Sequence, residues 1–186
     1  MGKDIIANIN SETFNIDMNI ASDIEPDTPD GHTSELAYGL FPGGGTINIG
    51  ENTDTSITIN EGLGTGYAVY ANNKSVVNIL GDTTIAVTGK DGAYALYADA
   101  YDTDKKNTGS NGGIINVGNG TSNISITGDV YAEDSAVINL NGDATFDGEK
   151  TVFTTQKNGT EIMGTINLAG GNMDGVLNIA EGSSVN

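Results

Sequence analysis

Short stretches of alternating apolar and polar residues recur along the chain and most end at glycine or asparagine. Residues 46–50, Thr-Ile-Asn-Ile-Gly, are typical. An alternation of period two predicts a half-buried β-strand. Because glycine or proline interrupts almost every ten-residue window, we expect almost no helix. Six stretches share a central asparagine between β-branched residues or leucine: 46–50, 76–81, 114–118, 137–142, 165–170 and 176–179.

Two more kinds of apolar stretch accompany these asparagine strands. One follows after a short turn, as Ser-Ile-Thr-Ile at 56–59 follows 46–50. The other precedes the next asparagine strand, as Val-Tyr-Ala at 69–71 precedes 76–81. The repeating unit is therefore three short strands separated by Gly and Asn turns. The central asparagines stand at positions 48, 78, 116, 139, 167 and 178.

A pattern that recurs every few tens of residues indicates a solenoid. We therefore predict an all-β, right-handed parallel β-helix with three short strands per coil, about five to six coils and one domain over residues 1–186. An antiparallel sandwich also uses short strands but needs no internal repeat. Segments 21–35 and 99–113, rich in Asp with Pro or with Lys and Asn, are predicted to be inserted loops. Because the interval from Asn167 to Asn178 is too short for a full turn, we count no complete coil after Asn167 and expect Asn178 in a different strand of the final coil or at a frayed end.

Stacked coils place equivalent side chains over one another at a spacing of about 4.8 Å. If Ile47 and Ile49 face the core, Asn48 faces outward. The asparagine column then has two interpretations. It forms an amide ladder that is hydrogen-bonded from coil to coil, or it offers a contact surface to a partner. We favour the ladder.

A second column carries aromatic rings. If Val69 and Leu96 face inward, the residue after each faces outward, and the rings form a stripe on one surface. Exposed rings are a common platform for sugars and partner proteins. The opposite phase, with the rings inside beside Ala68 or Ala95, is also physically reasonable. The candidate ligand-binding residues are Phe41, Tyr70, Tyr97, Tyr131 and Phe153.

Acidic or amide residues follow the glycine that ends several asparagine strands. Glu51, Asp82, Asn119 and Asp143 are therefore predicted to form a column with about 4.8 Å between neighbours. Glu51 and Asp82 would then fall within the carboxylate separations used by glycosidases. Carboxylate oxygens also suit calcium, so Glu51, Asp82 and Asp143 are candidate metal ligands. Stacked acids that splay into water need no function, and no other cofactor is expected.

Segment 21–35 holds a further group of acids and His32, the one histidine. The acids offer oxygen ligands but lack the EF-hand spacing. His32 has no cysteine and no Gly-x-Ser-x-Gly elbow to partner it. We therefore interpret the chain as non-enzymatic and His32 as a surface residue. The acids are Asp23, Glu25, Asp27 and Asp30.

Acidic residues outnumber basic ones 25 to 7, which gives a formal net charge of −18. Such a chain would repel nucleic acid and anionic lipid, so neither is expected as a partner. No stretch approaches about 18 consecutive apolar residues, so the chain is not expected to insert into a membrane. All seven basic residues are lysine, which removes the bidentate fork that arginine offers to phosphate. The lack of cysteine excludes disulfides and thiol nucleophiles.

The Gly-Tyr-Ala-Val-Tyr-Ala run at 66–71, its echo at 92–98 and the Ile-Asn-Ile-Gly rungs resemble the passenger region of bacterial autotransporters, the type V secreted proteins, with a pertactin-like β-helix. The resemblance covers about residues 40–182. It implies a Cys-poor β-helix exported across the outer membrane by a C-terminal β-barrel, often an adhesin involved in virulence. We find neither a signal peptide nor a barrel in these residues, so export is implied for a parent protein. The nucleophile motif of the protease passengers is missing.

These features favour a non-catalytic passenger segment at the cell surface or outside the cell. Its expected role is adhesion or a structural stalk, with host glycans or surface proteins as partners. The alternative is a carbohydrate-active β-helix, a glycosidase or polysaccharide lyase that uses surface carboxylates. Unpaired strand edges at the two ends of a solenoid also predict self-association.

Overall fold

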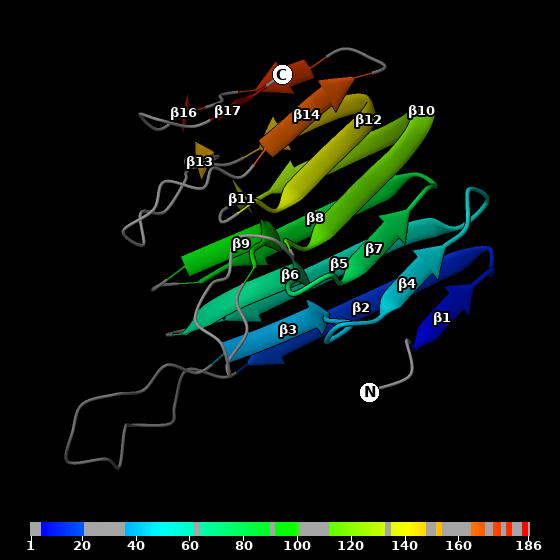
Figure 1. The fold of residues 1–186 in the computed structure, drawn as a ribbon, viewed down its shortest axis with the longest axis horizontal. Helices are drawn as coiled ribbons and strands as arrows, with labels where there is room; N and C mark the ends of the chain where they lie inside the picture. The colour runs from blue at the N-terminus through cyan, green and yellow to red at the C-terminus, as the bar shows by residue number, and fades with distance from the viewer. Residues whose placement is uncertain are drawn as a thin grey trace.

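The structure, a computed structural model, is a stack of parallel β-strands (Figure 1). All strand pairings within the described residues are parallel, which confirms the β-helix expected from the repeats. No helix in this part of the chain is long and apolar enough to cross a membrane. The described residues are 5–20, 36–61, 64–89, 92–100, 112–132, 135–147, 152–153, 165–169, 173–175, 178–179 and 184–185.

The first sheet contains the asparagine strands, one from each coil. Equivalent residues are in register from coil to coil, as in the pairs Ile47 with Val77 and Asn48 with Asn78. The coils stack from β1 at one end of the molecule to β14 and β17 at the other (Figure 1). The strands, in order, are β1 (Ile6–Ile9), β4 (Thr46–Ile49), β7 (Val76–Ile79), the first part of β10 (Ile114–Thr127), the first part of β12 (Val137–Asp147), β14 (Thr165–Ala169) and β17 (Ser184–Val185).

The second sheet carries the strands that follow each asparagine strand. In two coils the first two predicted strands form one long strand, β10 or β12, that belongs to both sheets. The pairing of these two strands shifts between Val117 and Ser122, where the chain passes from one sheet to the next. The strands are β2 (Thr13–Ile20), β5 (Asp54–Glu61), β8 (Thr83–Thr88), the second parts of β10 and β12, and β15 (Met173–Gly175).

The third sheet consists of β3 (Leu36–Leu40), β6 (Thr65–Ala71), β9 (Gly92–Ala98) and β11 (Asp129–Ala132). The short strands β13 (Val152–Phe153) and β16 (Asn178–Ile179) pair with each other. Asn178 therefore lies outside the asparagine sheet, in a different strand of the final coil, which was one of the two alternatives predicted.

The chain nevertheless returns to the asparagine sheet after Asn167. Ile166 pairs with Val185 of β17. The expectation that no complete coil follows Asn167 is wrong, because the return strand lies beyond Asn178.

The core is a set of apolar columns to which each coil contributes. Ile49, Ile79 and Leu140 are fully buried beneath the asparagine sheet. Each such side chain stabilises the fold by roughly 1.5 to 3 kcal/mol relative to full exposure. At the corner after β7 the backbones approach so closely that a Cβ on Gly81 would collide with the Thr53 carbonyl oxygen. Glycine at this corner therefore serves coil-to-coil packing.

The predicted loop 21–35, with its four acids and His32, lies outside the described residues. Of the predicted loop 99–113, the structure describes residues 99–100 and 112–113.

Candidate functional site

The outward asparagines of the first sheet form a continuous ladder. Each Nδ2 donates a hydrogen bond to the Oδ1 of the asparagine one coil nearer the N-terminus, at 2.6 to 2.8 Å. The predicted amide ladder is confirmed, and its amides are engaged with one another. The prediction missed Asn8, whose stretch has no glycine after it. The members are Asn8, Asn48, Asn78, Asn116, Asn139 and Asn167.

The third sheet settles the direction of the aromatic residues. Val69, Leu96 and Val130 are fully buried in the core. The rings lie on the other side of the sheet, where they pack against one another instead of entering the core. One column contains Tyr38, Tyr67 and Tyr94, with centroids 5.1 and 5.2 Å apart. The other contains Phe41, Tyr70, Tyr97 and Tyr131, with centroids 4.9 to 5.3 Å apart.

The first of these columns was not predicted, because strict alternation places residues three positions apart on opposite faces. A β-bulge changes this: Tyr94 and Leu96 pair with the consecutive residues Asp129 and Val130, which leaves Ala95 as an extra residue. Tyr94 and Tyr97 therefore lie on the same face and contact each other at 5.2 Å. The signal in the sequence was the repeated Tyr-x-x-Tyr spacing at 67–70 and 94–97.

A buried carboxylate fixes the centre of this aromatic cluster. The Tyr70 hydroxyl donates a hydrogen bond to Asp99 Oδ2 at 3.0 Å, and Asn72 Nδ2 donates to that hydroxyl at 3.4 Å. Tyr70 is 9% exposed and Asp99 is 4% exposed. Burial, and then the negative charge of Asp99, raise the pKa of Tyr70 well above the ordinary tyrosine value. The same two causes raise the pKa of Tyr38.

The predicted binding stripe is thus mostly engaged in its own packing. Tyr70 is buried and Tyr97 and Tyr131 are half-buried, while Phe41 is 44% exposed. The backbone of Phe153 lies in β13, and its side chain is outside the described residues. Stacked rings occupy one another's faces, which are the surfaces that a sugar ring would need. Phe41, at the end of its column, offers the most accessible ring.

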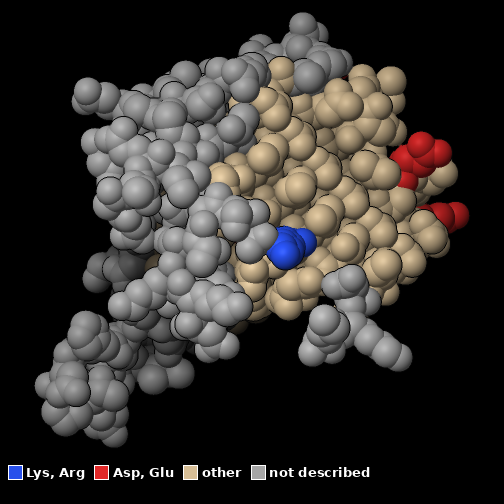
Figure 2. All heavy atoms as spheres, viewed as in Figure 1, with Lys and Arg blue, Asp and Glu red and all other residues tan. Residues whose placement is uncertain are grey.

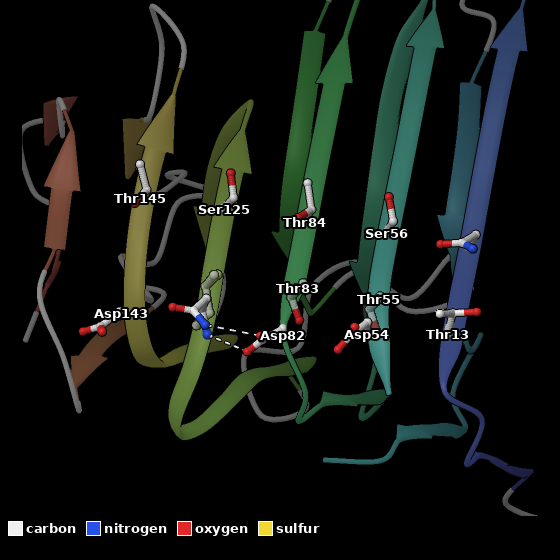
Figure 3. A pocket seen from close by; sticks show the side chains of 13 residues that line it. Thr13, Asp54, Thr55, Ser56, Asp82, Thr83, Thr84, Ser125, Asp143 and Thr145 are labelled. Carbon is white, nitrogen blue, oxygen red and sulfur yellow. Dashed lines mark hydrogen bonds between the residues drawn. The ribbon is translucent and has the colours of Figure 1, made fainter. Parts of the chain in front are cut away.

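The outer face of the second sheet is polar instead. It forms a shallow groove of about 500 Å³ across β2, β5, β8, β10 and β12 (Figure 3). Outward side chains align in rows along the solenoid, because the strands are in register. One row contains Thr13, Asp54, Asp82, Asn123 and Asp143, and the next contains Asn15, Ser56, Thr84, Ser125 and Thr145.

The register changes the predicted column of acids. Asp54, rather than Glu51, lies beside Asp82 (Figure 3). Asn123, rather than Asn119, lies between Asp82 and Asp143. The physical reason is that the corners differ in length. Asp54, in the first row of the groove, stands five residues after Ile49, whereas Asp82, in the same row one coil further on, stands three residues after Ile79.

The three candidate metal ligands are not brought together. Glu51 lies in the corner between β4 and β5, where it lines a different cavity with Glu12 and Asn52. Asp82 and Asp143 are separated by Asn123, whose backbone N–H and Nδ2 donate to the Asp82 carboxylate at 2.8 and 3.2 Å. Within the described ranges, no three His, Cys, Asp or Glu side chains are grouped closely enough to hold a metal ion.

On the face that Figure 2 shows, most of the described surface is uncharged, with basic atoms near the centre and acidic side chains gathered at one edge. Lys74 is the one lysine among the residues that the structure describes.

Comparisons of the chain with protein-family models, with curated proteins and with solved structures find no match.

Proposed function

We propose that this chain is a non-catalytic, extracellular solenoid segment that binds an extended glycan in the polar groove of the second sheet. The observation that carries the proposal is the pair of in-register rows, in which hydroxyl, amide and carboxylate groups repeat once per coil. Coils repeat at about 4.8 Å, so a linear polymer lying along the axis would meet a hydroxyl, amide or carboxylate group at each step.

The chemistry of the groove restricts the polymer. Asp54, Asp82 and Asp143 line it, and it has no basic side chain in its lining. An anionic polysaccharide would be repelled, whereas hydroxyl groups and amino groups find acceptors there. A neutral or amino-sugar glycan is therefore the proposed ligand class.

The proposed cellular setting rests on the resemblance to autotransporter passengers. The absence of cysteine and the repeated rungs are the features of this chain that resemble such segments. An adhesive stalk on a bacterial surface would use the stacked coils as a rigid spacer and the groove as its contact surface.

A glycan array that spans neutral, amino-sugar and anionic glycans tests the proposal. We expect binding to the first two classes and at least about a tenfold loss in the double variant Thr84→Val with Ser125→Ala, because removing two hydrogen-bonding groups from a binding site costs about 1.4 kcal/mol or more. Thr88→Val is the matched control, because Thr88 lies on the same strand as Thr84 but outside the groove lining.

Two results would contradict the groove as the binding site. One is unchanged binding in the Thr84 and Ser125 double variant. The other is loss of binding in Phe41→Ala, which removes the most accessible ring of the aromatic cluster and leaves the groove intact.

A glycosidase is the second candidate, favoured by one observation. Asp54 begins β5 and Asp82 directly precedes the neighbouring strand β8, and neighbouring strands are about 4.8 Å apart, near the carboxyl separation of about 5 Å in retaining glycosidases. Incubation with a polysaccharide panel would then release reducing ends, and Asp82→Asn would abolish the release. Binding without release of reducing ends would exclude this candidate for the glycans bound.

A further inference from the structure

The first coil leaves apolar surface uncovered at one end of the solenoid. The strands β1, β2 and β3 each pair on one side, with β4, β5 and β6, and no described strand pairs with their other edges. Among the side chains whose burial the structure describes, the large apolar ones that are exposed belong to this coil: Ile5 at 74%, Ile6 at 61%, Leu36 at 50% and Phe41 at 44%.

The inward side chains of β2 show the same gap in packing. Phe14, Ile16 and Met18 are half-buried, although Ile57 and Ile59, which pair with Ile16 and Met18 one coil further in, are fully buried. The core is therefore open at this end. A layer stacked on β2 would complete it.

Within the described residues, the edge of β2 also lacks the features that usually prevent strand pairing. Natural edge strands are commonly short, or carry lysine, proline, a bulge or an inward charge. β2 is eight residues long, its sequence is Thr-Phe-Asn-Ile-Asp-Met-Asn-Ile, and its register with β5 is unbroken. Its one charged residue, Asp17, faces outward.

The sequence of β2 is complementary to itself in the antiparallel direction. With a two-fold axis at Ile16, each Phe14 faces Met18 of a second copy, and Ile16 faces Ile16. On the outer face, Asp17 meets Asn15, an amide that can donate to a carboxylate. In this register inward side chains pair with inward ones and outward with outward, because the sequence numbers of the two paired residues differ by an even number. No charge meets a like charge.

We propose that β2 pairs antiparallel with β2 of a second copy of this chain, about a two-fold axis at Ile16. The pairing continues the second sheet across two molecules and covers Phe14, Ile16 and Met18 of each. A closed, isologous contact of this kind yields a dimer rather than a filament.

Disulfide trapping tests the geometry directly, because the chain has no cysteine. In Ile16→Cys, the two thiols would face each other with Cα atoms about 4.5 to 5.5 Å apart, which a disulfide can span. We expect a covalent dimer on oxidation. Met18→Cys is the matched control, since its two copies would lie about four residues apart, or about 13 Å, beyond disulfide reach.

Charge variants on the exposed face test the same register without altering the core. Asn15→Asp would place a carboxylate opposite Asp17 twice per dimer and weaken the dimer about tenfold or more in sedimentation. Adding Asp17→Lys to that variant would restore association by forming two Asp–Lys pairs. Thr88→Asp adds the same charge on β8, two coils from the edge, and should leave the dimer unchanged.

Three results would overturn the proposal. The chain could remain monomeric at every concentration, in which case this end is open or is covered by some other polypeptide. Met18→Cys could cross-link as readily as Ile16→Cys. The dimer could also persist unchanged in Asn15→Asp, which would place the contact elsewhere.

Discussion

Two outer faces of this solenoid are built over the same apolar core but use their outward side chains in opposite ways. On β6, Tyr67 and Tyr70 pack against rings of the neighbouring coils at centroid distances of 4.9 to 5.3 Å. At the start of β8, Thr84 and the preceding Asp82 are exposed to solvent. The comparison teaches that a stacked column either stabilises the fold or offers groups to a ligand. The rings of the aromatic face stabilise the fold, and the side chains of the polar groove line a space in which a ligand can contact them.

The largest predicted effect separates the two faces by stability. Tyr70→Ala removes a ring that is 9% exposed and packed against Tyr38, Phe41 and Tyr97, so the free energy of unfolding should fall by about 3 kcal/mol or more. Thr84→Ala, on the exposed face of the groove, should change it by less than about 0.5 kcal/mol. Urea denaturation measures both. Equal losses of unfolding free energy in Tyr70→Ala and Thr84→Ala would contradict the distinction between the aromatic face and the polar groove.

Alkaline pH should also weaken the aromatic face selectively. Tyr70 has a raised pKa in the folded state, so above the ordinary tyrosine pKa of 10.0 the unfolded chain releases a proton that the folded chain retains. Stability from this hydroxyl is fully present below pH 10 and decreases above it, by up to about 1.4 kcal/mol per pH unit for one proton. Denaturation of the wild type and of Tyr70→Phe between pH 9 and about 12 isolates the contribution.

In that experiment the two proteins should differ in slope above pH 10, with the steeper loss in the wild type. Parallel curves would mean that Tyr70 ionises alike in both states. Burial and the negative charge of Asp99 would then not hold the phenol in its protonated form.

The asparagine ladder provides the smallest predicted effect and a comparison within one column. Asn78 donates to Asn48 and accepts from Asn116, whereas Asn8 accepts from Asn48 at the exposed end. Asn78→Ala should lower the free energy of unfolding by about 1 to 2 kcal/mol, and Asn8→Ala by about half as much or less. Thermal or urea unfolding of the two variants would measure these losses in the free energy of unfolding. Equal losses would argue against a cooperative ladder.

Much of the fold could be predicted from local patterns, because each coil repeats them. The alternation around Asn48 and Asn78 fixed which residues face the core, and stacking like over like then predicted the amide ladder. The aromatic column of Tyr70, Tyr97 and Tyr131 was predicted in the same way. The polar groove was not identified as a site, because a row of serine and threonine has no catalytic or ligand signature of its own.

By itself, the sequence determined the β-strands, the parallel stacking and the inward apolar columns, because these depend on the alternation within each short stretch and on its repetition. Only the tertiary structure decided which outward side chains meet. Corners of different length bring Asp54, not Glu51, beside Asp82, and the extra residue Ala95 brings Tyr94 onto the same face as Tyr97. Both outcomes depend on the register between coils. That register is set by backbone pairing over the whole stack, since a shift of one residue would turn the apolar columns out of the core.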